Sequence, residues 1–257
     1  MGAVIDFSVA HSARVWDYWL GGRDNHAADR TAGDAVAAVY PDIVRVAKET
    51  RGLLARAVRY LAGEVGVRQF LDIGAGLPTV LNTHEVAHAV APDAQVVYVD
   101  NDPLVATYAR AWLADGQTQG VHYLEGDLRR PGVLMDDVAG VLDLERPVAV
   151  IFLEVLGHVA SLAEIRSILA KVMSPVTSGS YLVLGDTADT GPEIRRAERV
   201  FAATGTVPYH LRTVDQITEC FTGLELVPPG VVPFPAWRPD EGAPPALTAY
   251  GGVARKP

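Results

Sequence analysis

Acidic residues and glycines recur where three successive apolar segments of the chain end. The segment Asp72-Ile73-Gly74-Ala75-Gly76 pairs a carboxylate with two glycines, which let the backbone approach a ligand closely. Asp100 ends the next apolar segment, where a carboxylate can accept hydrogen bonds from both hydroxyls of a ribose. Asp127 follows the third segment and can reach an adenine amino group, while Leu128 can lie against the ring. Together the three positions predict a site for an adenosine-containing ligand.

The glycine segment alone is a weak signal, because several kinds of nucleotide site begin in this way. A nicotinamide-dinucleotide fingerprint has a third glycine three positions after the second, and Thr79 stands there instead. This difference disfavours a nicotinamide cofactor without excluding it. Each acid taken singly could also be a solvated loop residue or a helix cap, so the interpretation depends on their succession along the chain.

A second motif, His84-Glu85-Val86-Ala87-His88, matches the His-Glu-x-x-His signature of zinc sites. Both histidines would lie on one face of a helix, but a zinc enzyme also needs a third ligand and an open substrate cleft. The motif falls in the helix that follows the glycine segment, between sheet and solvent. We therefore predict no metal site.

The candidate residues need elements that bring them together. From residue 69 onward, short apolar segments alternate with helical patterns, which is typical of a parallel sheet covered on both faces. Right-handed crossovers make such a sheet doubly wound, and ligands bind at the carboxyl ends of its strands. The strands expected are Gln69–Ile73, Gln95–Asp100, Val121–Glu125, Val148–Leu153, Ser180–Leu184, Leu224–Val227 and Ala246–Ala254.

Helical patterns occupy the remainder of the chain. The first 66 residues predict a helical cap, in which Ser12 caps a first helix that ends at Gly21-Gly22. The stretch 228–245 holds seven prolines and predicts an irregular loop anchored by Trp237. No flexible linker is evident, so we predict one domain over residues 1–257, with a cap at 1–66 and a core at 67–257. The helices expected cover 27–39, 43–62, 79–90, 103–114, 134–141, 162–173, 193–203 and 214–221.

Composition narrows the classes of function. The 257 residues are 49% hydrophobic, enough to bury one sizeable core. A formal net charge of −9 disfavours nucleic acid and anionic membranes as partners. No apolar run approaches the ~20 residues that span a bilayer, and we find no targeting segment. The one cysteine, Cys220, cannot form an internal disulfide and is expected in the core, which fits a cytoplasmic protein.

The motifs resemble those of a known class of enzyme. Segments 72–76, 99–103 and 126–128 are similar to the first three S-adenosylmethionine (SAM) motifs of class I methyltransferases. Segment 13–25, ARVWDYWLGGRDN, resembles the N-terminal signature of an actinobacterial family of S-adenosyl methyltransferases, and parts of the tail at 224–253 do so too. The resemblance covers almost the whole chain. It implies a Rossmann-like α/β fold of seven strands with the last strand antiparallel, but no particular substrate, because the family's substrates are largely unassigned.

The resemblance also implies cofactor contacts for the matching residues. The backbone of the glycine segment would contact the methionine part of SAM, Asp100 would hold the ribose, and Asp127 would bond the adenine N6. The full set of contacts implied in these three motifs is Asp72, Gly74, Ala75, Gly76, Asp100, Asn101, Asp127 and Leu128.

The N-terminal signature adds four candidates for the cofactor site, Tyr18, Gly22, Arg23 and Asn25. They form a polar, aromatic and flexible cluster beside a helix end. We expect the segment to fold over the SAM site, with Arg23 or Asn25 near the amino-acid end of the cofactor. A turn between two helices with solvated charges is an equal alternative.

Methyl transfer from a sulfonium depends mainly on positioning and on a suitable electrostatic pocket. A general base is needed only if the acceptor arrives protonated. The fourth strand ends just before Glu154, which places Glu154 and His158 near the acceptor as candidate catalytic residues. His158 is the better base because imidazole titrates near neutrality, although it could merely cap the following turn. Asp186, Tyr209 and His210 are weaker candidates for the pocket.

We therefore predict a SAM-dependent methyltransferase that acts on a small-molecule acceptor. Two alternatives stay open at this point: a SAM-binding regulator without transfer activity, and an NAD-dependent oxidoreductase. The sequence gives no oligomeric state.

Overall fold

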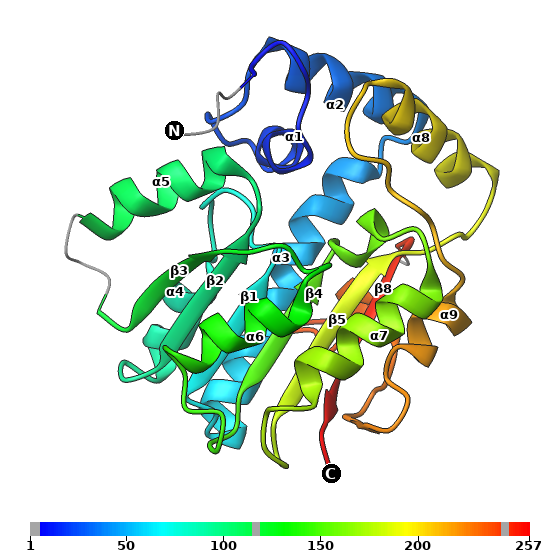
Figure 1. The fold of residues 1–257 in the computed structure, drawn as a ribbon. Helices are drawn as coiled ribbons and strands as arrows, with labels where there is room; N and C mark the ends of the chain where they lie inside the picture. Colours follow the sequence, from blue (N-terminus) through cyan, green and yellow to red (C-terminus); the bar gives the residue numbers. More distant parts are fainter. Residues whose placement is uncertain (1–5, 115–118, 243–246) are drawn as a thin grey trace.

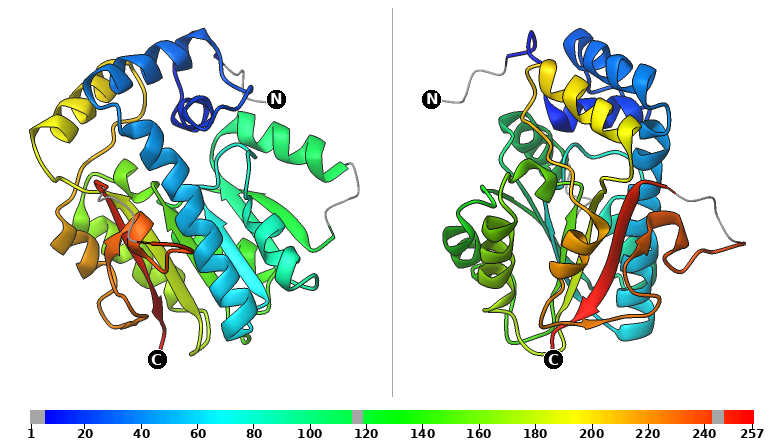
Figure 2. Two further views of the ribbon diagram at one scale, coloured as in Figure 1. Left: turned by 180° about the vertical axis from the view of Figure 1, so that it is seen from behind. Right: turned by 90° about the vertical axis from the view of Figure 1, so that its right-hand side faces the viewer.

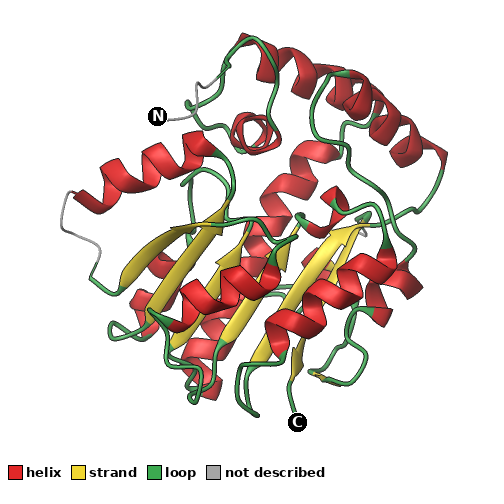
Figure 3. Cartoon of the chain, in the orientation of Figure 1, coloured by secondary structure: helices red, strands yellow, loops and turns green. Residues whose placement is uncertain are grey.

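A mixed sheet lies at the centre of the molecule (Figures 1 and 3). The computed structural model describes residues 6–114, 119–242 and 247–257. The strands lie in the order β3-β2-β1-β4-β5-β8-β6, and β7 also pairs with β8. Strands β1 to β5 are parallel, whereas β8 is antiparallel to its neighbours. The strands are β1 Gln69–Ile73, β2 Gln95–Asp100, β3 Val121–Glu125, β4 Ala149–Leu153, β5 Tyr181–Thr187, β6 Glu225–Leu226, β7 Val232–Pro233 and β8 Ala249–Arg255.

The expected sheet is confirmed in its doubly wound order and its antiparallel last strand. The sequence predicts seven strands, and the described residues carry an eighth, the two-residue β7. This strand lies in the proline-rich stretch, and Pro233 has no N–H with which to continue a ladder. Trp237 of the same stretch is fully buried, as an anchor must be. Pro244 and Pro245 lie outside the described residues.

Helices cover both faces of the sheet (Figure 2). One face carries α3 Ile43–Arg59 and α4 Thr83–Val90, and the other carries α6 Pro131–Ala139 and α7 Leu162–Met173. Two apolar clusters fill the space between sheet and helices, because alternate residues of the buried strands point to opposite faces. Cys220, next to α9 Val214–Glu219, is buried in the second cluster as expected. Helix α5 Pro103–Ala114 packs beside the edge strand β3.

A layer of three helices covers the carboxyl ends of the strands (Figures 1 and 2). Helices α1 Ser12–Trp19 and α2 Ala27–Val39 form it as the sequence predicts, and α8 Pro192–Ala203 packs against α2. The recruitment of α8 from a distant part of the chain has no sequence signal. The organisation as one domain divided at residue 66 stays a prediction.

Several helix ends differ from the predicted ones for local reasons. His11 rather than Ser12 occupies the N-cap of α1, and no side chain caps that helix. Helix α4 begins at Thr83 instead of residue 79, because Asn82 and Glu85 form a capping box there. The residues between Gly76 and Asn82 are thereby left as a loop at the edge of the sheet.

Candidate active site

An open cavity lies where the carboxyl ends of β1, β2 and β4 face α1. It encloses about 1270 Å³, including open space at its mouth. The chain order of the sheet reverses between β1 and β4, which is the place where doubly wound sheets bind ligands. The structure brings ten of the predicted site residues to this cavity: Asp72, Gly74, Ala75, Gly76, Asp100, Asn101, Asp127, Leu128, Glu154 and His158.

The glycine loop joins the ends of β1 and β2. Gly74 and Gly76 have φ angles of 78° and 65°, in the left-handed region that favours glycine. The Gly74 N–H donates to Val99 O at 2.8 Å, and the Gly76 N–H donates to Asp100 Oδ2 at 2.8 Å. A Cβ on Gly74 would lie 2.3 Å from the Val155 side chain. The loop therefore presents bare backbone to the cavity.

Asp100 is the buried acid at the end of β2. Its two oxygens accept hydrogen bonds from the backbone N–H groups of Gly76 and Asp102. Burial raises the pKa of this carboxyl, and the two backbone donors oppose the rise. A carboxylate has about four acceptor positions, so Asp100 retains capacity for the two hydroxyls of a ribose. This donor set fits the adenosine part of SAM.

The start of α1 reaches the same acidic strand end. His11 Nδ1 lies 2.9 Å from Asp102 Oδ2, and Asp102 also accepts the N–H of Leu104 at 2.8 Å. Burial favours a higher pKa for Asp102, but the hydrogen bond and charge of His11 hold the pKa below its usual value. His11 lines the cavity, so this contact fastens the helical layer directly beside Asp100.

Arg51 of α3 lines the cavity near Asp72. Asp72 is buried, and Thr83 Oγ1 donates to its Oδ2 at 2.5 Å. Burial raises the pKa of Asp72, while Thr83 and the Arg51 charge lower it. Arg129 is a second cation at the cavity wall. Sequence reasoning found neither arginine. Arg51 lies in α3, well before the first motif, whereas Arg129 directly follows Leu128, and that adjacency is the signal that could have indicated it.

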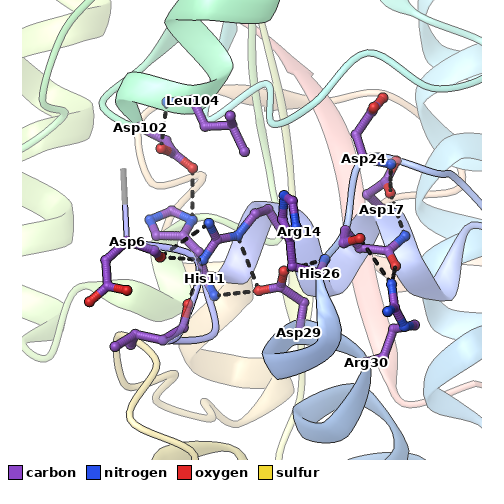
Figure 4. Close-up of polar contacts among 12 residues, drawn as sticks. Asp6, His11, Arg14, Asp17, Asp24, His26, Asp29, Arg30, Asp102 and Leu104 are labelled. Atoms are coloured by element: carbon purple, nitrogen blue, oxygen red, sulfur yellow. Dashed lines mark hydrogen bonds and ion pairs between the residues drawn. The ribbon is translucent and has the colours of Figure 1, made fainter. Parts of the chain in front are cut away.

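The N-terminal signature is held together around a buried ion pair (Figure 4). Asp29 has no exposed surface and accepts hydrogen bonds from Arg14 Nε at 3.1 Å and from the N–H groups of His11 and His26 at 2.9 and 2.8 Å. Arg14 is itself 3% exposed and donates to the carbonyls of Asp6 and Val9. One carboxylate therefore orders the start of both α1 and α2.

A second carboxylate, Asp17, braces the turn after α1 (Figure 4). Its Oδ2 accepts the Asp24 N–H at 2.9 Å and Asn25 Nδ2 at 2.8 Å. Gly22 passes so close that a Cβ there would lie 1.9 Å from Asp17 Oδ1. Asp24 Oδ1 in turn accepts the hydroxyl of Tyr108 on α5 at 2.8 Å. Gly22 and Asn25 thus shape the turn, and the bond between Asp24 and Tyr108 ties the turn to α5.

The four signature candidates do not line the cavity. Asn25 is bonded within the turn, the Tyr18 hydroxyl donates to Asp34 at 2.7 Å, and Arg23 is exposed. The signature does fold over the site, but other residues face it. The helical periodicity of α1 could have identified these other residues, because side chains three or four positions apart lie on one face of a helix. They are His11, Ser12, Ala13, Trp16, Asp17 and Leu20.

Glu154 follows β4 with a φ of 56°, which is uncommon for a residue with a Cβ. Its carboxylate accepts the Tyr209 hydroxyl at 2.7 Å and the Thr187 hydroxyl at 3.0 Å. The same Tyr209 hydroxyl lies 3.2 Å from Asp186 Oδ1. Burial, together with the neighbouring Asp186 charge, raises the pKa of Glu154 to about 8. Such backbone strain is typical of functional sites, and here it places two buried carboxyls beside one hydroxyl.

His158 lies one turn beyond Glu154, in the short 3₁₀ helix Leu156–His158. Its Nδ1 is 3.0 Å from the carbonyl of Pro208, so Nδ1 carries a proton and Nε2 is the basic atom. Burial lowers the pKa of His158, although the bond to Pro208 opposes this. The imidazole bonds this carbonyl of a distant segment and does not cap the turn that follows it.

A second cavity adjoins the first. It encloses about 460 Å³, including open space, between β4, β5 and the helices α1, α2 and α8. Trp16, Glu154 and His158 line both cavities. Tyr209 lines the second one only, as does Leu211, and the close approach of the Tyr209 ring requires glycine at position 157. His210 lines neither cavity.

The histidines of the zinc-like motif are engaged elsewhere. His84 Nδ1 lies 2.8 Å from the Tyr98 hydroxyl, and His88 Nε2 lies 2.9 Å from the carbonyl of Ala94. Within residues 6–114, 119–242 and 247–257, no three His, Cys, Asp or Glu side chains form a group that could hold a metal ion. The helices of the same ranges include none with the length and apolarity of a bilayer span.

The doubly wound sheet with its antiparallel last strand is the class I methyltransferase fold. The chain belongs to the S-adenosyl methyltransferase family, whose family model matches residues 1–257. It is therefore a SAM-dependent methyltransferase, and the family match favours SAM over a nicotinamide cofactor. No curated protein matches the chain.

Solved structures agree with this assignment. A DUF574-family protein from Streptomyces avermitilis is 40% identical, with a TM-score of 0.92 over 99% of this chain and 100% of that one. A candidate methyltransferase from Thermobifida fusca is also 40% identical, with a TM-score of 0.92 over 98% and 96% of the two chains. The magnesium protoporphyrin IX methyltransferase of Synechocystis, solved with S-adenosylhomocysteine, is 12% identical with a TM-score of 0.57 over 95% and 93%, and shares the fold alone.

Proposed function

We propose that this methyltransferase transfers the methyl group of SAM to a small-molecule acceptor held in the second cavity. One observation carries the proposal: the cavity at the glycine loop and the more apolar cavity beneath α8 share a wall formed by Trp16, Glu154 and His158. A cofactor in the first cavity and an acceptor in the second would meet at that wall. SAM supplies an electrophilic methyl group that already has a good leaving group, so the protein needs chiefly to align the two molecules.

The residues of the first cavity suit the parts of SAM. Asp100 would accept the ribose hydroxyls, and Asp127 and Leu128 would flank the adenine. The backbone of Gly74–Gly76 would hold the methionine part beside Asp72. Arg51 extends the set that the sequence predicts, since a guanidinium pairs well with the carboxylate of an amino acid.

The Asp100→Ala variant tests the cofactor site. We expect affinity for S-adenosylhomocysteine to fall by about 1–3 kcal/mol, because buried charge-assisted hydrogen bonds are lost. Isothermal titration calorimetry measures this directly, and Asp93→Ala, an exposed acid beyond α4, is a matched control. Equal affinities for Asp100→Ala and the wild-type protein would show that the ribose lies elsewhere. NAD should give no heat of binding.

His158 would accept the proton that the acceptor releases, through its Nε2 atom. For the His158→Asn variant we expect turnover to fall about 10²-fold, while an asparagine amide can still donate to the Pro208 carbonyl. Release of S-adenosylhomocysteine reports the rate with any acceptor that screening identifies. His122→Asn, on β3, is the control for replacing a histidine away from both cavities. Undiminished turnover in His158→Asn would remove this residue from the mechanism.

The net charge and the single cysteine bear on the acceptor and on the location of the enzyme. The net charge of −9 supports a small molecule rather than a nucleic acid as the acceptor. Burial raises the pKa of the Cys220 thiol to about 11, so this cysteine is held unreactive. A lone buried thiol fits the predicted cytoplasmic location.

A further inference from the structure

Four aromatic side chains, Trp16, Trp19, Phe201 and Tyr209, contribute to the walls of the second cavity. Trp16 and Trp19 meet edge to face with ring centroids 5.6 Å apart, and Trp19 lies 6.4 Å from the ring of Phe201. On the opposite side Tyr209 meets the His158 ring at 5.4 Å. Aliphatic side chains of α2, α8 and the start of α3 complete the lining. Such a space takes a compact apolar body with the size of a ring.

The charges in this cavity have one sign. Among the described residues that line it, Glu198 and Glu154 are the acidic ones, and no lysine or arginine contributes. Glu198 supplies the negative charge, because Glu154 keeps its proton near pH 7. Arg212 is buried behind the wall, and it donates to the carbonyls of Leu156, Val159 and His210 instead of facing the space. The arginines Arg51 and Arg129 line only the first cavity. An anionic acceptor would therefore meet the Glu198 carboxylate and the Glu154 carboxyl group without a compensating cation.

Aromatic faces combined with carboxylates form a recognition site for an ammonium group. A cation is attracted to the faces of tryptophan and tyrosine rings, and aromatic cages bind alkylammonium ligands in this way. We propose that the acceptor is an amine on a compact apolar body, and that the enzyme is an N-methyltransferase. The inference depends on the proposed acceptor role of the second cavity, and it adds the chemical class of the acceptor.

Glu154 and His158, which line both cavities, can orient the amine and take up the proton that methyl transfer releases. The amine first loses its ammonium proton to solvent. Its nitrogen lone pair then forms a bond to the methyl carbon as the bond from that carbon to sulfur breaks, and the sulfur keeps the electron pair. The N–H proton of the methylated nitrogen passes to Nε2 of His158. A carboxyl oxygen of Glu154 accepts a hydrogen bond from the acceptor nitrogen and orients its lone pair.

Three probes of one size separate the possible classes of acceptor: 2-phenylethylamine, 2-phenylethanol and phenylacetate. Each is titrated into the full-length protein saturated with S-adenosylhomocysteine. The change in intrinsic tryptophan fluorescence reports binding, because two of the four tryptophans, Trp16 and Trp19, line the cavity. We expect the amine to bind about tenfold more tightly than the alcohol, and phenylacetate to bind more weakly than both. With SAM in place of the product, mass spectrometry should show the amine heavier by one CH₂ group.

The Glu198→Gln variant tests whether the negative charge of Glu198 favours the binding of an amine. It should reduce the preference for amine over alcohol severalfold while the affinity for the alcohol stays the same. Glu193→Gln, an exposed residue of the same helix, is the matched control and should retain the preference. Equal or tighter binding of the alcohol or of phenylacetate, or no binding of the amine to the saturated protein, would overturn the inference alone. A protein that fails to bind S-adenosylhomocysteine at all would instead contradict the proposed function.

Discussion

Asp29→Ala is expected to lower the free energy of unfolding by about 3–5 kcal/mol, the cost of removing one partner of a buried ion pair. Asp29 and the Arg14 guanidinium have side chains that are 0% and 4% exposed. Without Asp29, the guanidinium would remain buried with carbonyl partners only, and the N–H groups of His11 and His26 would lose their acceptor. The effect should spread through the whole domain, because Val15 and Trp19 of α1 belong to the same apolar cluster as β1 and β4.

Urea unfolding of three further variants separates charge from hydrogen bonding. Asp240→Ala breaks an exposed pair with Arg59 and should cost no more than about 1 kcal/mol. Asp29→Asn retains an acceptor oxygen for one of the two backbone donors and should fall between wild type and Asp29→Ala. Combining Asp29→Ala with Arg14→Met removes the stranded charge and should recover part of the loss. A loss in Asp29→Ala no greater than that in Asp240→Ala would contradict the buried pair.

The sequence carries enough information to predict the sheet, because buried parallel strands are short apolar runs that need no knowledge of their neighbours. β1, β2 and β3 begin and end at the predicted residues. The glycine loop and the acids follow from the same reasoning, since carboxyl ends of parallel strands must lie at one edge. Ten predicted site residues accordingly meet at one cavity.

The packing of the N-terminal helical layer on the sheet could not be predicted from the sequence in the same way. Its pattern shows that a helix exists, but the way in which the layer docks on the cavity depends on an ion pair and a hydrogen bond with residues far along the chain. Asp102 is 91 residues from its partner His11, and Tyr108 is 84 residues from Asp24. The signature therefore resembles a ligand-binding cluster in sequence, whereas Gly22 and Asn25 serve the turn around Asp17. Arg51 and the second cavity depend on the same tertiary docking.

A large pH effect should come from the two carboxyls that share the Tyr209 hydroxyl. Burial raises the pKa of Glu154 to about 8 and the pKa of Asp186 to about 7, although the charge of Arg212 lowers the latter. An unfolded chain would ionise both near pH 4. Between about pH 4 and 8 the folded protein thus holds protons that the unfolded chain has released, so stability must fall as pH rises. One pKa unit corresponds to about 1.4 kcal/mol, so the total loss is on the order of several kcal/mol.

The Glu154→Gln variant removes the carboxyl whose pKa is raised to about 8. The unfolding free energy of this variant minus that of the wild-type protein should grow from pH 5 to pH 8 and then level off, because a glutamine has no proton to release. The test is how this difference in unfolding free energy changes with pH, not its absolute size, because the new amide also changes the bonds to Thr187 and Tyr209. Glu145→Gln, at an exposed loop position, should differ from wild type by the same amount at every pH. If the Glu154→Gln difference is also flat, the carboxyls are ionised in the folded protein, and Glu154 presents a full negative charge to the acceptor cavity.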